Sequence, residues 1–417
     1  MYLLKNRVRP YAWGSRTTIA ELLGRPVPAK HPEAEMWLGA HPGDPSAVVA
    51  ADGAETSLID VLAADPAAQL GPAVAGRWGD RLPFLLKVLA AEEPLSLQAH
   101  PSADQAREGY RREERAGIPR EAGNRNYPDP TAKPELVCAL TEFHALAGFR
   151  EPARTVELLR AIETPALSGH VDLLAAEADG EGLRALFTTW ITLPQPVIDA
   201  LLPDLLDSCV THVKEHGEFE LECRTVLELG ERYPGDCGVL AALLLNRLVL
   251  QPGEAMFLPA GNLHTYLHGT AVEILANSDN VLRGGLTPKH VDVPELLRVL
   301  DFAFGDMRVT TGEPAGPRRV YRTAAPEFEL SRIEWDAADD LARAEVKLEG
   351  GAPRILVCVD GGVRAAAVDG RELTLARGQS MWLPAADPDV VLAPAGDGRV
   401  RLFAATVGSE TAGVSSL

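Results

Sequence analysis

The fold of this chain is decided by the stretch GEAMFLPAGNLHT, residues 253–265. Gly253 opens a short apolar strand, Pro259 and Gly261 turn the chain, and His264 follows the turn. Because proline fixes φ and glycine accepts positive φ, this Pro-x-Gly unit predicts a tight turn. The stretch therefore predicts a β-hairpin that points His264 inward as a candidate metal ligand.

The spacing of this stretch, G-x5-P-x-G-x2-H, is similar to the second sequence motif of the cupin barrels. The same pattern recurs near the C-terminus, where Arg377–Ala385 match Pro252–Ala260. The second copy has no following glycine or histidine, and no histidine occurs after His290. The sequence therefore predicts two cupin-type jelly-roll barrels, of which the C-terminal one at 316–417 is degenerate and holds no metal.

Composition and charge limit the classes of protein. The 417 residues suggest two or three domains, and 46% hydrophobic with 24% charged residues is typical of globular proteins. A formal charge of −19 argues against general binding to nucleic acid or to anionic membranes, since those surfaces need a positive field. The five cysteines are scattered without a C-x-x-C pair, which predicts reduced thiols. With no signal-like N-terminus and no run of about 18 apolar residues, we expect a cytoplasmic protein, and a monomer.

The spacing of apolar residues changes in the middle of the chain. Between Glu151 and Tyr233 they recur every three or four positions, which predicts helices. We therefore expect a mainly β protein with an α-helical domain inserted at 151–235, between the two parts of a catalytic barrel at 1–150 and 236–315. The expected strands lie at 82–89, 95–100, 135–140, 328–335, 355–359 and 390–392, and several short strands separated by turns are expected between 248 and 275. Helices are expected after Ser102 and at 293–300.

Four residues form a candidate metal site. Gln98 and His100 stand two apart on an expected strand, so their side chains share a face, and Glu135 begins another strand. Alone, such a histidine is more often a hydrogen-bonded core residue, and such a glutamate is more often a solvated edge group. Together with His264 they supply two imidazoles, one carboxylate and one amide oxygen, a set that suits zinc or another divalent first-row metal.

The segment from Asn277 to Lys289 carries a second signal. Its Asn, Ser and Asp residues are typical of a polar turn. Arg283 and Lys289 flank Gly284-Gly285, where the backbone can approach closely, and would form a cationic patch that suits phosphate. Lys87 and Lys133 are further cations from the strand regions, although either one alone is more typical of a surface lysine.

At this point the chain resembles the type I mannose-6-phosphate isomerases, or phosphomannose isomerases. The resemblance rests on Tyr11–Ser15, Ala34–Pro42, Leu82–Ser102, Lys133–Leu136, Pro259–Glu273 and Asn277–Lys289. It implies a catalytic cupin barrel with a helical insertion, followed by a second barrel. It also implies one zinc ion per chain, held by Gln98, His100, Glu135 and His264.

The reaction implied by the resemblance interconverts D-mannose 6-phosphate and D-fructose 6-phosphate through a cis-enediol, and feeds mannose and GDP-mannose metabolism. The catalytic residues implied are Arg283, which would stabilise the developing enediolate, and Lys133 and Glu273. The implied partner is a small sugar phosphate, not nucleic acid or a membrane. Contacts to its phosphate and hydroxyl groups are expected from Lys87, Ser96, Tyr266, Asp279 and Lys289.

One departure from the family leaves the general base open. Many bacterial relatives carry a histidine at the position of Ala132, and alanine cannot transfer a proton. Two other classes also remain. A metal-dependent cupin oxygenase would use similar ligands but gives no reason for a cationic phosphate pocket. A non-catalytic sugar-phosphate-binding cupin predicts affinity without turnover.

Overall fold

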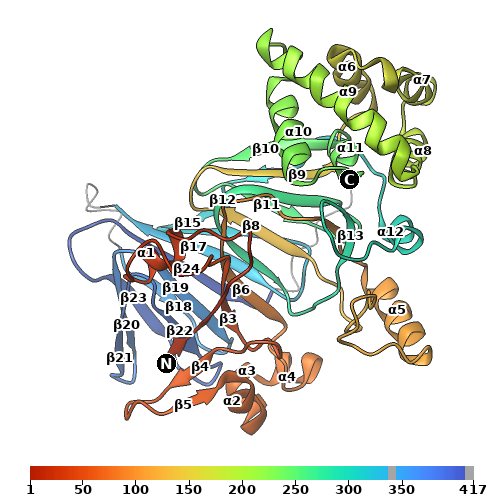
Figure 1. The fold of residues 1–417 in the computed structure, drawn as a ribbon. Helices are drawn as coiled ribbons and strands as arrows, with labels where there is room; N and C mark the ends of the chain where they lie inside the picture. Colours follow the sequence, from red (N-terminus) through yellow and green to blue (C-terminus); the bar gives the residue numbers. More distant parts are fainter. Residues whose placement is uncertain (337–343, 409–417) are drawn as a thin grey trace.

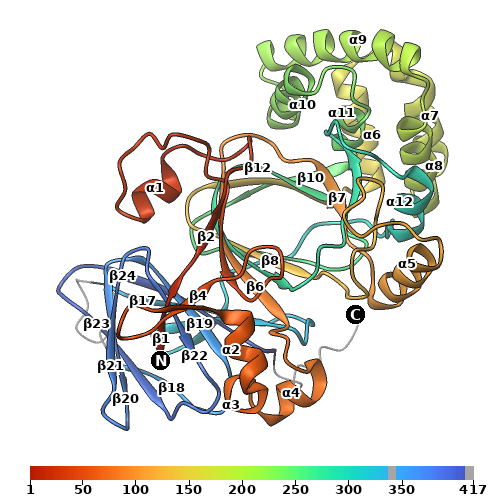
Figure 2. The same cartoon turned by 60° about the horizontal axis from the view of Figure 1, so that its bottom comes forward.

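The first barrel is a curved antiparallel sheet of eleven strands in the computed structural model, which describes residues 1–336 and 344–408 (Figures 1 and 2). Its main path runs β14-β11-β8-β12-β6-β3-β2, and β7, β9, β10 and β13 are attached through β12. The strands are β2 (Arg7–Arg9), β3 (Glu35–Gly39), β6 (Phe84–Ala91), β7 (Leu97–Ala99), β8 (Glu135–Ala139), β9 (Phe143–Phe149), β10 (Leu245–Leu250), β11 (Ala255–Leu258), β12 (His264–Ala276), β13 (Leu282–Gly285) and β14 (Val309–Thr310).

The strands β3, β6 and β8 of this sheet are buried along their whole length. All of β6 is buried, which explains why its sequence is a nearly continuous apolar run instead of an alternating one. Lys87 is the charged exception in β6, and it lies opposite Glu273 in the β6–β12 register. The sheet thus brings two opposite charges together on neighbouring buried strands.

The predicted turn at Pro259–Gly261 is present, but the predicted hairpin is wrong. Gly261 has φ of +79°, and the N–H of Asn262 donates to the carbonyl of Pro259 at 3.3 Å. β11 and β12 do not pair with each other, because β8 lies between them in the sheet. The turn carries the chain across one strand, a connection that local spacing cannot distinguish from a hairpin.

The second barrel consists of two facing sheets that enclose an apolar core. The order of the nine-stranded sheet is β15-β16-β17-β24-β19-β22-β1-β4-β5, and that of the four-stranded sheet is β18-β23-β20-β21. Their strands are β1 (Tyr2–Lys5), β4 (Ala47–Val49), β5 (Glu55–Ser57), β15 (Glu313–Ala315), β16 (Arg318–Tyr321), β17 (Glu329–Trp335), β18 (Val346–Leu348), β19 (Arg354–Asp360), β20 (Gly362–Ala367), β21 (Glu372–Ala376), β22 (Ser380–Leu383), β23 (Val390–Pro394) and β24 (Val400–Thr406).

The N-terminus joins this second barrel, which the sequence analysis did not expect. β1 pairs with β22 on one side and with β4 on the other, so residues from both ends of the chain share a sheet. The sequence instead predicts that 1–150 forms the first part of the catalytic barrel. A pairing between strands almost 380 residues apart leaves no local signal, because the short apolar strand Tyr2–Lys5 suits either sheet.

The helices predicted between 151 and 235 are present and form a separate layer at one end of the first barrel (Figure 1). They pack through their apolar faces into one buried cluster that reaches β7 and β13. These helices are α6 (Pro152–Ile162), η1 (Pro165–Leu167), α7 (Ser168–Ala176), α8 (Gly180–Ile191), α9 (Gln195–Lys214), α10 (Glu220–Arg232) and, after them, α11 (Gly238–Ala242).

The remaining helices lie outside this layer. They are α1 (Thr18–Leu22), α2 (Leu58–Ala64), α3 (Pro66–Leu70), α4 (Pro72–Trp78), α5 (Ala103–Arg115) and α12 (Val293–Val299). The helix expected after Ser102 is α5, which begins with the predicted cap: Ser102 and Gln105 form a capping box. In the part of the chain that is described, no single helix meets the length and hydropathy expected of a membrane span; α8 and α9, bent by 109°, meet it only as a pair.

Candidate active site

Three buried side chains meet at one end of the first barrel. His100 follows β7, Glu135 begins β8 and His264 begins β12, and each is at most 2% exposed. Nε2 of His100 lies 3.3 Å from one carboxylate oxygen of Glu135, and Nε2 of His264 lies 3.4 Å from the other. The donor atoms all lie within 4.8 Å of one another, a spacing that one metal ion can bridge.

The free nitrogen atoms of the two imidazoles fit a divalent metal. Nδ1 of His100 donates to the carbonyl of Asn280 at 2.7 Å, and Nδ1 of His264 donates to the carbonyl of Asn262 at 3.1 Å. These bonds leave both Nε2 lone pairs buried, without a hydrogen-bond partner and close to Glu135. Burial lowers the pKa of His100 to about 4, so its ring is neutral near pH 7.

The carboxylate of this cluster is held in its charged form. Nζ of Lys133 lies 3.2 Å from an oxygen of Glu135. Burial would raise the pKa of Glu135, but His100 and Lys133 together hold it well below the usual value. Gln98 lies opposite His264 in the register of β7 and β12 and lines the same cavity as Glu135. The sheet therefore brings together the four residues that the sequence singled out.

A buried network of charges continues from this cluster across three neighbouring strands. Nζ of Lys87 on β6 lies 3.2 Å from Glu273 on β12 and 3.5 Å from Glu35 on β3. The hydroxyl of Tyr266 donates to Glu273 at 2.8 Å. Glu35 also accepts from the indole N–H of Trp37 at 2.6 Å. Every charged group in this network is paired, as burial requires.

Burial and pairing shift the pKa values in this network in different directions. Burial opposes the charge of Lys87, but the carboxylates of Glu35 and Glu273 outweigh it and raise the pKa above the usual lysine range. For Glu273, burial raises the pKa, against the opposing effect of Lys87. Burial and the neighbouring Glu273 also raise the pKa of Tyr266 well above 10. Glu273 is thus the carboxyl group in this network whose pKa moves toward neutral pH.

A cavity of about 540 Å³ opens above the cluster. It is lined by all the predicted site residues except the two buried histidines, namely Lys87, Ser96, Gln98, Lys133, Glu135, Tyr266, Glu273, Asp279, Arg283 and Lys289. The structure therefore collects residues from distant parts of the sequence around one space.

Two cations at this cavity have no anionic partner. Within the described residues, no hydrogen bond or ion pair is found for the guanidinium of Arg283 or for the ammonium of Lys289. Burial lowers the pKa of Arg283, and burial together with Arg283 lowers that of Lys289. Arg283 could instead serve only to anchor its own loop through salt bridges, but no contact among the described residues supports that role. Both groups are available to an anionic ligand.

Asp279 on the cavity wall is paired with a buried histidine. Its carboxylate lies 3.2 Å from Nε2 of His41, whose Nδ1 accepts from the backbone N–H of Gly43 at 3.0 Å. Burial would raise the pKa of Asp279, but the hydrogen bond from His41 lowers it. The side chain is therefore anionic near neutral pH and is held beside His41.

The comparisons with known proteins agree with this geometry. Residues 1–152 match the family model described as phosphomannose isomerase type I, catalytic domain. The mannose-6-phosphate isomerase of Escherichia coli (strain K12) is 39% identical over 399 residues, which cover 94% of this chain and 97% of the relative. The chain belongs to the type I phosphomannose isomerase family.

Relatives of this family extend the similarity to mammals and to solved structures. The mannose-6-phosphate isomerase of Bos taurus is 34% identical over 353 residues, which cover 78% of this chain and 80% of the relative. A crystal structure of the Salmonella typhimurium enzyme, bound to its substrate fructose 6-phosphate and to zinc, matches with a TM-score of 0.86 and 36% identity. The match covers 98% of this chain and 100% of that one.

Sequence reasoning missed some residues of this phosphomannose isomerase site. Glu35 and His41 lie in a stretch that carried the family resemblance, but their pairing with Lys87 and Asp279 depends on contacts between strands far apart in the chain. Tyr233 lines the cavity from the end of the helical insertion and has no local motif. One signal could have pointed to Glu35. Lys87 lies in an apolar strand, and a buried lysine needs an acidic partner.

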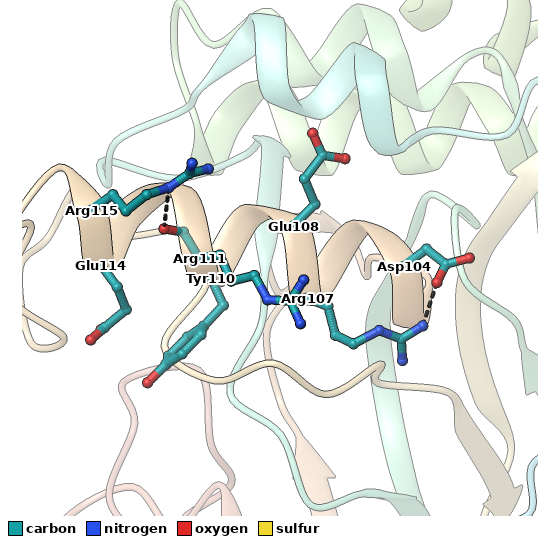
Figure 3. A pocket seen from close by; sticks show the side chains of 7 residues that line it. All are labelled: Asp104, Arg107, Glu108, Tyr110, Arg111, Glu114 and Arg115. Carbon is teal, nitrogen blue, oxygen red and sulfur yellow. Dashed lines mark hydrogen bonds and ion pairs between the residues drawn. The ribbon is translucent and has the colours of Figure 1, made fainter.

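A second and larger hollow, of about 630 Å³, lies along the outside of α5 (Figure 3). The seven residues that line it all come from this one helix. Arg107 pairs there with Asp104, and Nε of Arg115 donates to the carbonyl of Arg111 at 3.2 Å. One helix face encloses no buried side chains that could bind a metal ion or a substrate. We therefore assign the chemistry of this family member to the smaller cavity, beside Glu135.

Proposed function

We propose that this chain is a zinc-dependent isomerase that interconverts D-mannose 6-phosphate and D-fructose 6-phosphate. The observation that carries the proposal is one cavity with two kinds of unsatisfied group. Beneath it, His100 and His264 offer free lone pairs beside Glu135, which suits zinc. Beside it, Arg283 and Lys289 offer unpaired positive charge, which suits a phosphate or a developing oxyanion.

The proposed reaction needs proton transfers but no oxidant. The proton on C2 of the aldose is removed, an enediol forms, and a proton is added at C1, while the hydroxyl proton moves from O2 to O1. We assign the transfer at carbon to Glu273 or Lys133, both of which line the cavity. Arg283 stabilises the charge that develops on the enediolate oxygens. Zinc held by His100, Glu135 and His264 would supply a Lewis acid to this site.

The remaining residues bind and orient the substrate in this proposal. Gln98 is the fourth candidate zinc ligand, through its amide oxygen. Phosphate and hydroxyl contacts are assigned to Lys87, Ser96, Tyr266, Asp279 and Lys289, which all line the cavity. Because Lys87 and Tyr266 already bond Glu273, they also fix that carboxylate in one orientation.

The domain division at 150, 235 and 315, the monomeric state and the cytoplasmic location belong to the same proposal. The observed layers support the division, with one qualification: β1, β4 and β5 extend the sheet of the second barrel. Size-exclusion chromatography coupled to light scattering tests the monomer against the 44.7 kDa mass of the chain.

A coupled assay tests the function directly. Purified protein is supplied with mannose 6-phosphate, and fructose 6-phosphate is measured with and without a chelator. The proposal requires turnover that is lost with the metal and restored by zinc. Binding of the sugar phosphate without turnover in the zinc-loaded protein would instead support the non-catalytic sugar-phosphate-binding cupin.

A further inference from the structure

One carboxylate next to the helical insertion holds the backbone of the segment that carries Arg283 and Lys289. Asp236 lies between α10 and α11. Its Oδ1 accepts from the backbone N–H of Gly238 at 2.7 Å and of Leu286 at 2.9 Å, and its Oδ2 accepts from the N–H of Thr287 at 3.1 Å. Hydrogen bonds to an ionised acceptor are stronger than neutral ones.

The backbone held by Asp236 is strained. Leu286 has φ of +55°, which is uncommon for a residue with a side chain, and only 1% of it is exposed. Gly285 has φ of +123°, and a Cβ there would lie 2.7 Å from Cα of Gly238. Such a conformation persists only where its surroundings determine it. The carboxylate of Asp236 is one such determinant, since it bonds two successive N–H groups at this bend.

This bend sets the position of both unpaired cations. Arg283 lies opposite Gln98 in the register of β13 and β7, and a register shift separates it from Gly285. On the other side of the bend, the hydroxyl of Thr287 accepts from the N–H of Lys289 at 3.1 Å. Because the two cationic side chains have no hydrogen-bond or ion-pair partner among the described residues, their placement depends on the backbone that carries them.

We infer that Asp236 is a positioning residue for the reaction: it holds residues 285–287 so that Arg283 and Lys289 face the cavity. The inference rests on the proposed function. It also links the helical insertion to the site, because the turn that follows α10 places this carboxylate against the segment that carries Arg283 and Lys289. A purely structural role, as a cap for α11, predicts lower stability and unchanged kinetics for the folded protein.

The test compares Asp236→Ala with a matched control, Asp179→Ala. Asp179 also accepts two backbone N–H bonds, at 2.9 and 3.1 Å, but it caps α8 and does not line the cavity. We expect Asp236→Ala to lower kcat by about 10- to 100-fold, the scale of a misplacement of about 1 Å, at normal zinc content. Asp179→Ala should lower the melting temperature, with kcat changed less than about twofold.

Two further variants separate positioning from general damage. Asp236→Asn should recover part of the loss, because its amide oxygen can replace Oδ1 but its NH2 group cannot accept from Thr287. Adding Asp236→Ala to an Arg283→Ala protein should cost much less than it does in the wild type, because the positioned group is already gone. An equal loss in both backgrounds, or kinetics like those of Asp179→Ala, would overturn the inference.

A binding measurement keeps this test independent of the proposed reaction. Calorimetry with inorganic phosphate on the zinc-loaded protein should show weaker binding for Asp236→Ala than for Asp179→Ala. If the wild type binds phosphate but does not isomerise the sugar, the proposed function fails while the positioning of the cations stands. Equal phosphate affinity in the two variants contradicts the positioning role.

Discussion

The two barrels share one local pattern but have opposite interiors. Gly253 and Gly378 occupy equivalent places before β11 and β22, with φ of +90° and +82°. Met256 and Met381 follow three residues later, and both are fully buried. The first barrel then continues to His264 and encloses paired charges, whereas the described part of the second barrel has an apolar core cluster and, as its buried polar residues, Ser331, Arg332 and Ser380. The same strand and turn thus serve packing in one barrel and chemistry in the other.

This difference has an energetic basis. Charges taken out of water destabilise a fold unless they are paired, so the first barrel keeps each buried charge close to a partner. In the described part of the second barrel the buried charge is Arg332, which lies 3.3 Å from Glu334. This barrel also contacts the first at the start of its motif. The hydroxyl of Tyr321 donates to the carbonyl of Gly253 at 2.8 Å, and the side chain of Arg332 covers the same glycine.

The largest effect is expected from removing a histidine that only the first barrel has. His264→Ala should remove most of the bound zinc and reduce isomerisation to background, because sites with few protein ligands tolerate ligand loss poorly. Elemental analysis and the coupled assay measure both. Full zinc occupancy in this variant would place the metal elsewhere.

A smaller effect, on turnover alone, is expected at the cavity of the first barrel. Arg283→Ala should lower kcat by at least about 100-fold at normal zinc content, the scale of losing one preorganised electrostatic group. Arg283→Lys should recover only part of that, since a point charge cannot reproduce the planar fork of donors. A raised KM with unchanged kcat would reduce Arg283 to a binding group.

Met256 and Met381, which occupy equivalent places in the two barrels, allow the same substitution to be compared in both. Met256→Ala and Met381→Ala each remove a fully buried side chain, and each should lower the free energy of unfolding by about 2–5 kcal/mol. Only Met256→Ala should also lower activity in the folded protein, because Met256 lies opposite Val137 on β8, the strand that begins with Glu135. Denaturant unfolding and the coupled assay measure the two effects. Equal activity losses in the two variants would show that packing in the second barrel also affects catalysis.

The smallest effect depends on pH and is expected at a histidine of the first barrel; the sequence has no histidine after His290. The hydrogen bond to Glu228 on α10 raises the pKa of His268 on β12. Because the pKa of His268 is higher in the folded than in the unfolded protein, its protonation stabilises the fold. This stabilisation is complete below the unfolded pKa of about 6.5 and is lost as pH rises through the folded pKa. Because the pair is partly exposed, we expect less than about 1 kcal/mol.

Melting curves of wild type and Glu228→Gln should therefore differ at pH 5.5 and converge at pH 9. Arg322→Gln provides the control: it removes a surface pair with Glu313 in the second barrel, which contains no histidine. Its effect should not change between these two pH values. A difference for Glu228→Gln that grows toward pH 9 would contradict the assignment of the proton to His268.

The sequence predicts the parts of the structure that have local signals. Strand and helix spacing, the Pro259 turn and the Ser102 cap depend on neighbouring residues, so their predictions are confirmed within a few positions. The convergence of Gln98, His100, Glu135 and His264 was implied by the family resemblance. Spacing alone gave a strong signal for His264 only.

The parts that were missed depend on contacts between distant segments. The order β11-β8-β12 and the pairing of β1 with β22 are set by which strands bury the most apolar surface, and no local pattern encodes that choice. The same holds for the pairing of Glu35 with Lys87 and for the bonds from Asp236 to Leu286. Their partners lie about 50 residues apart in the chain.

A zinc titration of the metal-free protein tests the central claim most directly. Zinc is removed with a chelator, added back in known amounts, and isomerisation of mannose 6-phosphate is measured at each bound stoichiometry. The site of the first barrel predicts no turnover without zinc and a linear rise that ends at one zinc per chain. Full turnover in the metal-free protein, or a rise that continues to two bound ions, would contradict it.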